Sequence, residues 1–184
     1  MRPARAARFA ALSIGLSAAL ALTGCGMSLP FMSSKPAVPC PSAVILRPLA
    51  NTAIFGPTAT ERRPDNVAFY GLLSEVDAKC DYVGDTVRET LDVIVIGERG
   101  PAARTDSADF TYFLAVVGPG QAVLSKKNFS VHIAIPPGQK RSGVTDHIQE
   151  AIPLAGHAGA DLNLRLGFQQ TPEVVDFYKH FRGR

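Results

Sequence analysis

Residues 109–135 read DFTYFLAVVGPGQAVLSKKNFSVHIAI, and this stretch decides the fold. Its first part, 109–117, is apolar at successive positions, which is typical of a strand that is buried on both faces in the middle of a sheet. Gly118-Pro-Gly-Gln121 is a turn signal, and the chain then returns as a second strand over 122–135. The sequence therefore predicts a β-hairpin over residues 109–135.

Shorter apolar segments, separated by Gly and Pro, flank this hairpin. They predict strands over 42–49, 52–55, 67–82, 87–96 and 162–168. The long segment 67–82 loses its alternation at Glu75, which indicates a bulge near Ser74. Residues 144–154 fit either a helix or a strand, and we favour a strand because the neighbouring segments are strands.

The last segment differs from the rest because it has helical signals. Thr171-Pro172 provides an N-cap followed by a proline at the first helical position, and Phe177 and Phe181 fall on one face. We expect a short amphipathic helix over 172–182. About seven strands with this helix predict an all-β protein, an Ig-like antiparallel β-sandwich over 40–184, with a small closed β-barrel as the alternative.

The N-terminus has the features of a secretory signal. Residues 1–24 carry three arginines and no acid, then a short apolar run that is too short to span a bilayer. The run ends in Leu22-Thr-Gly-Cys25, which resembles the lipobox of bacterial lipoproteins. The resemblance implies that Cys25 is acylated, for example with palmitate, and becomes the first residue after cleavage. Gly26 stands where Asp would retain such a protein at the inner membrane, so the resemblance favours the periplasmic face of the outer membrane.

Composition narrows the class of partner. The signal holds three of the 19 basic residues and none of the 16 acidic ones, so the remaining chain has no formal net charge. A neutral domain argues against nucleic acid as a partner. Residues 25–39 contain the lipidated cysteine and a Pro- and Ser-rich stretch that we interpret as a tether, which reaches at most roughly 50 Å.

Two cysteines remain after Cys25, namely Cys40 and Cys80. The compartment beyond a secretory signal is oxidising, so we expect them to form a disulfide. Two lone cysteines this far apart suit neither a metal site nor a redox motif.

The sequence has no recognisable catalytic motif. It lacks a Gly-x-Ser-x-Gly nucleophile elbow and a phosphate-binding loop, and its four histidines show no metal-ligand spacing. We therefore expect no enzymatic activity, no metal and no cofactor. Lys126-Lys127 with Lys140-Arg141 could contact lipid headgroups, although lysines that protect an edge strand are the simpler interpretation.

The domain is also similar to a group of uncharacterised lipoproteins from Gram-negative bacteria. The matching stretches are Arg99-Gly-Pro-Ala-Ala103, Asp109-Phe-Thr-Tyr-Phe113, Ile152-Pro-Leu154, Gly167-Phe-Gln169 and Thr171-Pro-Glu173. No activity is assigned to that group, so the resemblance supports an intact domain and implies no site.

These observations predict a lipid-anchored envelope protein that acts as a structural or interaction module with an envelope protein as partner. The candidate interaction surface consists of Arg99 and Arg104 in a polar loop and of Phe177, Tyr178 and Phe181 on the helix. Packing of the helix on its own sandwich is the competing interpretation. Two other functions remain open: a carrier of an apolar ligand such as a lipid, held between the sheets, and an enzyme whose residues lie far apart in sequence.

Overall fold

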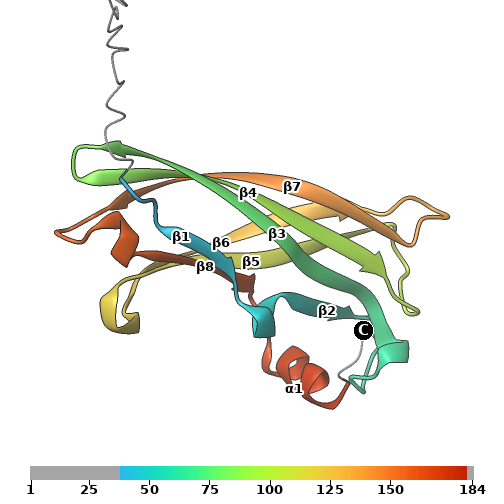
Figure 1. The fold of residues 1–184 in the computed structure, drawn as a ribbon. Helices are drawn as coiled ribbons and strands as arrows, with labels where there is room; N and C mark the ends of the chain where they lie inside the picture. Colours follow the sequence, from blue (N-terminus) through green and yellow to red (C-terminus); the bar gives the residue numbers. More distant parts are fainter. Residues whose placement is uncertain (1–37, 182–184) are drawn as a thin grey trace, which may run out of the picture. The chain divides into compact units, whose positions relative to one another are not determined.

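The computed structural model describes residues 38–181, so the predicted signal, Cys25 and most of the tether lie outside the described residues. Eight strands form two four-stranded sheets (Figure 1). One sheet has the order β1 (Ser42–Ile45), β8 (Asn163–Phe168), β5 (Ser107–Val117) and β6 (Val123–Ala134). The other has the order β2 (Asn51–Phe55), β3 (Val67–Val83), β4 (Thr86–Arg99) and β7 (Arg141–Pro153). The all-β sandwich is confirmed, as two separate sheets instead of a closed barrel.

The predicted hairpin is formed by β5 and β6, which pair antiparallel around the short 3-10 turn η3 (Pro119–Gln121). β5 lies inside its sheet and is apolar on both faces, because both faces are covered by other side chains. Its inner side chains enter the core between the sheets, whereas Phe113, Ala115 and Val117 on the outer face are covered by Leu46 and Leu49. The second covering layer accounts for the lack of alternation in the sequence.

The prediction of a strand over 42–49 was wrong after Ile45. The chain there turns into the 3-10 helix η1 (Arg47–Leu49), because Pro48 cannot donate a hydrogen bond to a sheet. β1 pairs in parallel with β8, with Ser42 opposite Asn163, whereas the other strand pairs within residues 38–181 are antiparallel. After η1 the chain crosses to the other sheet as β2, so 42–49 and 52–55 belong to different sheets.

The second sheet follows the predicted pattern closely. β3 has a register shift between Leu73 and Glu75, which confirms the expected bulge, and it pairs with β4 along nearly its whole length. The ambiguous segment 144–154 is a strand, β7, paired antiparallel with β4. Its inward side chains include Ile148 and Ile152, which are buried in the core.

Large side chains fill the space between the sheets. Phe110, Tyr112 and Phe168 have almost no exposed surface, and the Tyr112 hydroxyl donates a hydrogen bond of 2.6 Å to the Asp146 carboxylate on β7. Burial and the nearby Asp146 raise the pKa of Tyr112, so its hydroxyl stays protonated and remains a donor.

The sandwich has two ends, which we name the disulfide end and the helix end. The disulfide end holds the β3–β4 turn at 84–85, the β5–β6 turn at 118–122 and the start of the described chain. Cys40 and Cys80 form the predicted disulfide there, with 5.8 Å between their Cα atoms. The Tyr82 hydroxyl donates a 2.6 Å hydrogen bond to the Pro39 carbonyl, which fixes the chain close to this end.

The helix end holds α1 (Pro172–His180) and the β4–β5 loop at 100–106. The helix confirms the prediction, although it ends at His180 instead of residue 182, which lies beyond the described residues. Within residues 38–181, no helix combines the length and the apolar character that a membrane crossing needs.

Candidate functional site

The position of α1 follows from its sequence signals. The Thr171 side chain accepts the Val174 backbone N–H at 3.5 Å, the contact expected of an N-cap, and Pro172 follows at the first helical position. The Gln170 side chain also donates to the Asn51 carbonyl on β2. These contacts direct the helix onto the outer face of the sheet that contains β2, β3 and β4.

An aromatic cluster holds the helix on that face. Phe177 is buried, and its ring meets the Phe55 ring edge-on at 5.3 Å and the Phe181 ring at 5.2 Å. The Tyr178 hydroxyl donates a 3.0 Å hydrogen bond to the Thr52 carbonyl. Phe177 and Tyr178 therefore pack on the protein's own sheet, as the competing interpretation predicted, whereas Phe181 remains 40% exposed.

A groove of about 550 Å³ lies between α1 and this outer face. Its lining is mostly aromatic and aliphatic, with a charged pair at one side. The lining residues are Asn51, Pro64, Tyr70, Gly71, Leu72, Ile96, Glu98, Arg141, Phe177, Tyr178 and Phe181. The volume falls in the range of sites that hold a small molecule or an anchoring side chain of a partner. We take this groove as the candidate functional site.

The charged side of the groove is held together by Glu98 of β4. Its carboxylate lies 3.3 Å from the Arg141 guanidinium and 3.8 Å from the Lys140 ammonium. Glu98 is partly buried, whereas the two cations are mostly exposed. The groove thus has an apolar floor and a charge-compensated polar wall.

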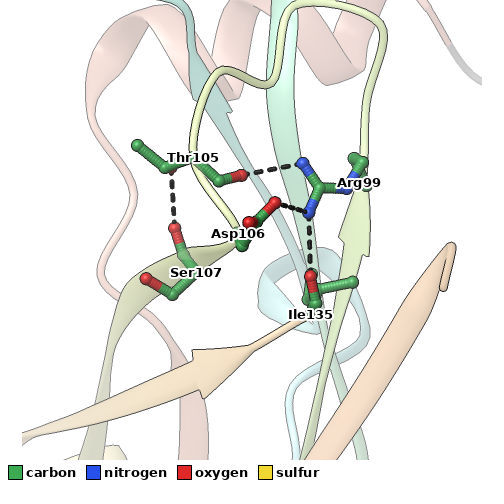
Figure 2. A network of polar contacts seen from close by, with 5 residues as sticks. All are labelled: Arg99, Thr105, Asp106, Ser107 and Ile135. Carbon is green, nitrogen blue, oxygen red and sulfur yellow. Dashed lines mark hydrogen bonds and ion pairs between the residues drawn. The ribbon is translucent and has the colours of Figure 1, made fainter. Parts of the chain in front are cut away.

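Arg99 and Arg104, both predicted as surface residues, have different environments. Figure 2 shows the Arg99 guanidinium at the centre of a polar network, where it donates to the Thr105 carbonyl at 2.8 Å, the Asp106 carboxylate at 2.7 Å and the Ile135 carbonyl at 2.8 Å. Only 25% of its side chain is exposed. Arg99 therefore ties the β4–β5 loop to the end of β6, and Arg104 is the exposed arginine of that loop.

A second unusual group lies at the disulfide end, in the core. Glu89 of β4 is 1% exposed, and neither carboxylate oxygen has a hydrogen-bond partner among the residues that the structure describes. Burial raises the pKa of Glu89 from 4.5 to about 7. Its neighbours across the ladder are Cys80 on β3 and Glu150 on β7, and Glu150 is paired with Lys127 at 2.6 Å.

The remaining polar residues from the sequence analysis have local partners. Lys126 bonds to Gln169 at 2.9 Å and lies over the Phe113 ring, and the pairing of Lys127 with Glu150 is given above. His132 and His147 each lie beside an aspartate of the neighbouring strand. Among residues 38–181, no three His, Cys, Asp or Glu side chains are grouped so that they could hold a metal ion.

Sequence reasoning found the helix side of the groove and missed the sheet side. Tyr70, Leu72 and Ile96 were not singled out, because nothing in the sequence indicates where α1 docks. Glu89 did leave a signal. It falls in the period-two series with Val87, Leu91 and Val93, which the structure places on the buried face of β4.

The description of the groove and of the buried Glu89 rests only on the geometry of the structure. Comparisons with models of protein families, with curated proteins and with solved structures find no match for this chain.

Proposed function

We propose that the protein is a lipid-anchored envelope protein that faces the periplasm and acts as a non-enzymatic interaction module. It binds an apolar segment of a partner protein of the envelope in the groove beside α1. The observation that carries this proposal is the groove, where Tyr70, Phe177 and a half-exposed Phe181 surround an apolar floor. Aromatic side chains in a central pocket are the residues that contribute most to protein–protein affinity.

The polar wall supports a protein partner over a purely apolar ligand. Glu98 and Arg141 border the groove, and the Arg141 side chain is 60% exposed. A charged rim around an apolar centre is the usual anatomy of a protein interface, and the rim can bond the peptide groups of a bound segment.

A carrier of an apolar ligand such as a lipid is the second candidate. The groove volume of about 550 Å³ favours it, because that volume suits a small ligand. Phe110, Tyr112 and Phe168 occupy the space between the sheets, so such a ligand would bind in the groove and not between the sheets as first expected.

Site-specific photo-crosslinking in cells tests the groove. A benzoyl-phenylalanine replaces Phe181, which is 40% exposed and lines the groove, or Val175, which is 38% exposed on the same helix but outside the groove lining. We expect a discrete protein adduct from position 181 and none from position 175. The variant Ile96→Lys, which puts a charge on the groove floor, should abolish the adduct while leaving the circular dichroism spectrum unchanged.

Two results contradict the interaction module. Identical adducts from positions 181 and 175 would mean that the contact is unspecific. Lipid adducts without protein at position 181 would favour the ligand carrier.

The anchor needs its own test, in the full chain. Metabolic labelling with an alkyne analogue of palmitate should label the wild-type protein and the variant Cys40→Ser, but not Cys25→Ser. Cys40→Ser is the matched control, because it removes the same atoms from a cysteine that we place in the disulfide. Labelling of Cys25→Ser would refute lipidation at this position.

A further inference from the structure

The disulfide end carries exposed apolar side chains at its turns. Val83 ends β3 and is 49% exposed, whereas Val123 and Leu124 begin β6 and are 63% and 47% exposed. Turn tips are ordinarily polar, because their side chains face water. Val38, the first described residue, is also exposed at this end.

The strand registers place these side chains at one end of the sandwich. Val83 pairs with Thr86 across the β3–β4 turn, and Val117 pairs with both Val123 of β6 and Asn163 of β8. Asn163 in turn lies opposite Ser42 at the start of β1. The two turns therefore lie at the end of the domain where the described chain begins, as Figure 1 shows.

Pro39 and Cys40 are fixed at this end of the domain. The Cys40–Cys80 disulfide and the hydrogen bond from Tyr82 to the Pro39 carbonyl hold it beside the β3–β4 turn. Only residues 26–38 separate Pro39 from Cys25, and thirteen residues span at most roughly 45 Å. A membrane that holds Cys25 is therefore within reach of the turns.

We propose that the disulfide end rests on the bilayer surface, with Val83, Val123 and Leu124 inserted at the boundary between the lipid headgroups and the acyl chains. This inference rests on the proposed lipid anchor at Cys25. Three half-exposed apolar side chains bind a bilayer weakly by themselves, but a short tether gives them a high effective concentration at the surface. The contact orients the domain, so the groove faces away from the membrane, roughly 40 Å along β3 from the Val83 turn.

Tryptophan fluorescence tests the contact, because the chain contains no Trp. The full lipidated protein carries Val83→Trp, Val123→Trp or, as the matched control, Val175→Trp, an exposed valine on α1 at the helix end. Each variant is reconstituted into vesicles of phosphatidylethanolamine and phosphatidylglycerol, with normal or brominated acyl chains. Flotation on a density gradient reports whether the protein is anchored at all.

We expect bromine to quench Val83→Trp and Val123→Trp by roughly twofold and to leave Val175→Trp unchanged, because insertion reaches only the upper acyl region. Floating protein in which all three tryptophans are equally unquenched would overturn the contact and leave the anchor intact. Protein that does not float would refute the lipid anchor at Cys25, and the proposed membrane contact, which rests on that anchor, would be refuted as well.

Discussion

Glu89 gives the protein a predictable dependence of stability on pH. Its carboxyl lies in the core at 1% exposure, with no hydrogen-bond partner among the described residues, and its pKa is raised from 4.5 to about 7. Glu150 lies directly opposite Glu89 on β7, and its partner Lys127 comes from β6 of the facing sheet. A second carboxylate opposite Glu89 adds no stabilisation to an ionised Glu89.

The sign of the pH dependence of stability follows from the direction of the pKa shift of Glu89. The folded protein holds the Glu89 proton more tightly than the unfolded chain, so the stabilisation from protonated Glu89 is complete below pH 4.5 and is lost as the pH rises through about 7. A shift of this size corresponds to about 3 kcal/mol in total, of which about 2.5 kcal/mol is lost between pH 5 and pH 8. That loss is a large fraction of the stability of a typical domain.

Urea unfolding followed by far-ultraviolet circular dichroism at pH 5, 6, 7 and 8 measures this loss. The variant Glu89→Gln keeps the shape of the side chain but cannot ionise, so its unfolding free energy should lack this decrease. Glu75→Gln makes the same change at an exposed position of the same sheet and should keep the wild-type decrease. Equal pH profiles for wild type and Glu89→Gln would refute the reasoning, as would a larger decrease between pH 5 and pH 8 in Glu89→Gln than in the wild type.

Three further predictions concern single contacts, each measured by urea unfolding. The double variant Cys40→Ser/Cys80→Ser opens a loop of about 40 residues and should lose at most about 4 kcal/mol; no loss would mean that the disulfide does not constrain the unfolded chain. Arg99→Ala should cost about 1 to 2 kcal/mol, because it removes three hydrogen bonds, of which the one to the Ile135 carbonyl is partly buried. Arg104→Ala is the exposed control and should stay within about 0.5 kcal/mol, so equal losses would contradict the network. Tyr112→Phe should cost about 2 kcal/mol at neutral pH, because it removes the donor to a partly buried carboxylate; a neutral effect would show that the bond is not maintained.

The local pattern of the sequence was sufficient for most of the sandwich. Residues 109–135 predicted the β5–β6 hairpin, and the broken alternation at Glu75 located the bulge. These features are local, because turn residues and the period of side chains act within one or two strands. The disulfide was predicted in another way, from the expected oxidising compartment and from the two cysteines that remain if Cys25 is lipidated, and the structure contains the Cys40–Cys80 bond.

The parts that the sequence did not reveal depend on contacts between distant segments. The parallel pairing of β1 with β8 joins residues about 120 positions apart, and no local pattern encodes it. The groove requires α1 to dock across β3 and β4, so its sheet side appears only in the assembled fold. Arg99 looked like a surface residue because its acceptors are mainly backbone carbonyls, which every sequence has.

The disulfide also decides how the domain bears a mechanical load. A pull on the chain ahead of Cys40 passes through the covalent bond to Cys80 and so into β3, a strand of 17 residues paired along β4. The load then acts along the strand axis and is shared by many backbone hydrogen bonds at once. With the disulfide reduced, the same pull would fall on β1, whose parallel pairing with β8 is four residues long. Oxidation of one cysteine pair thus moves the force from the four-residue pairing of β1 with β8 to the long ladder between β3 and β4.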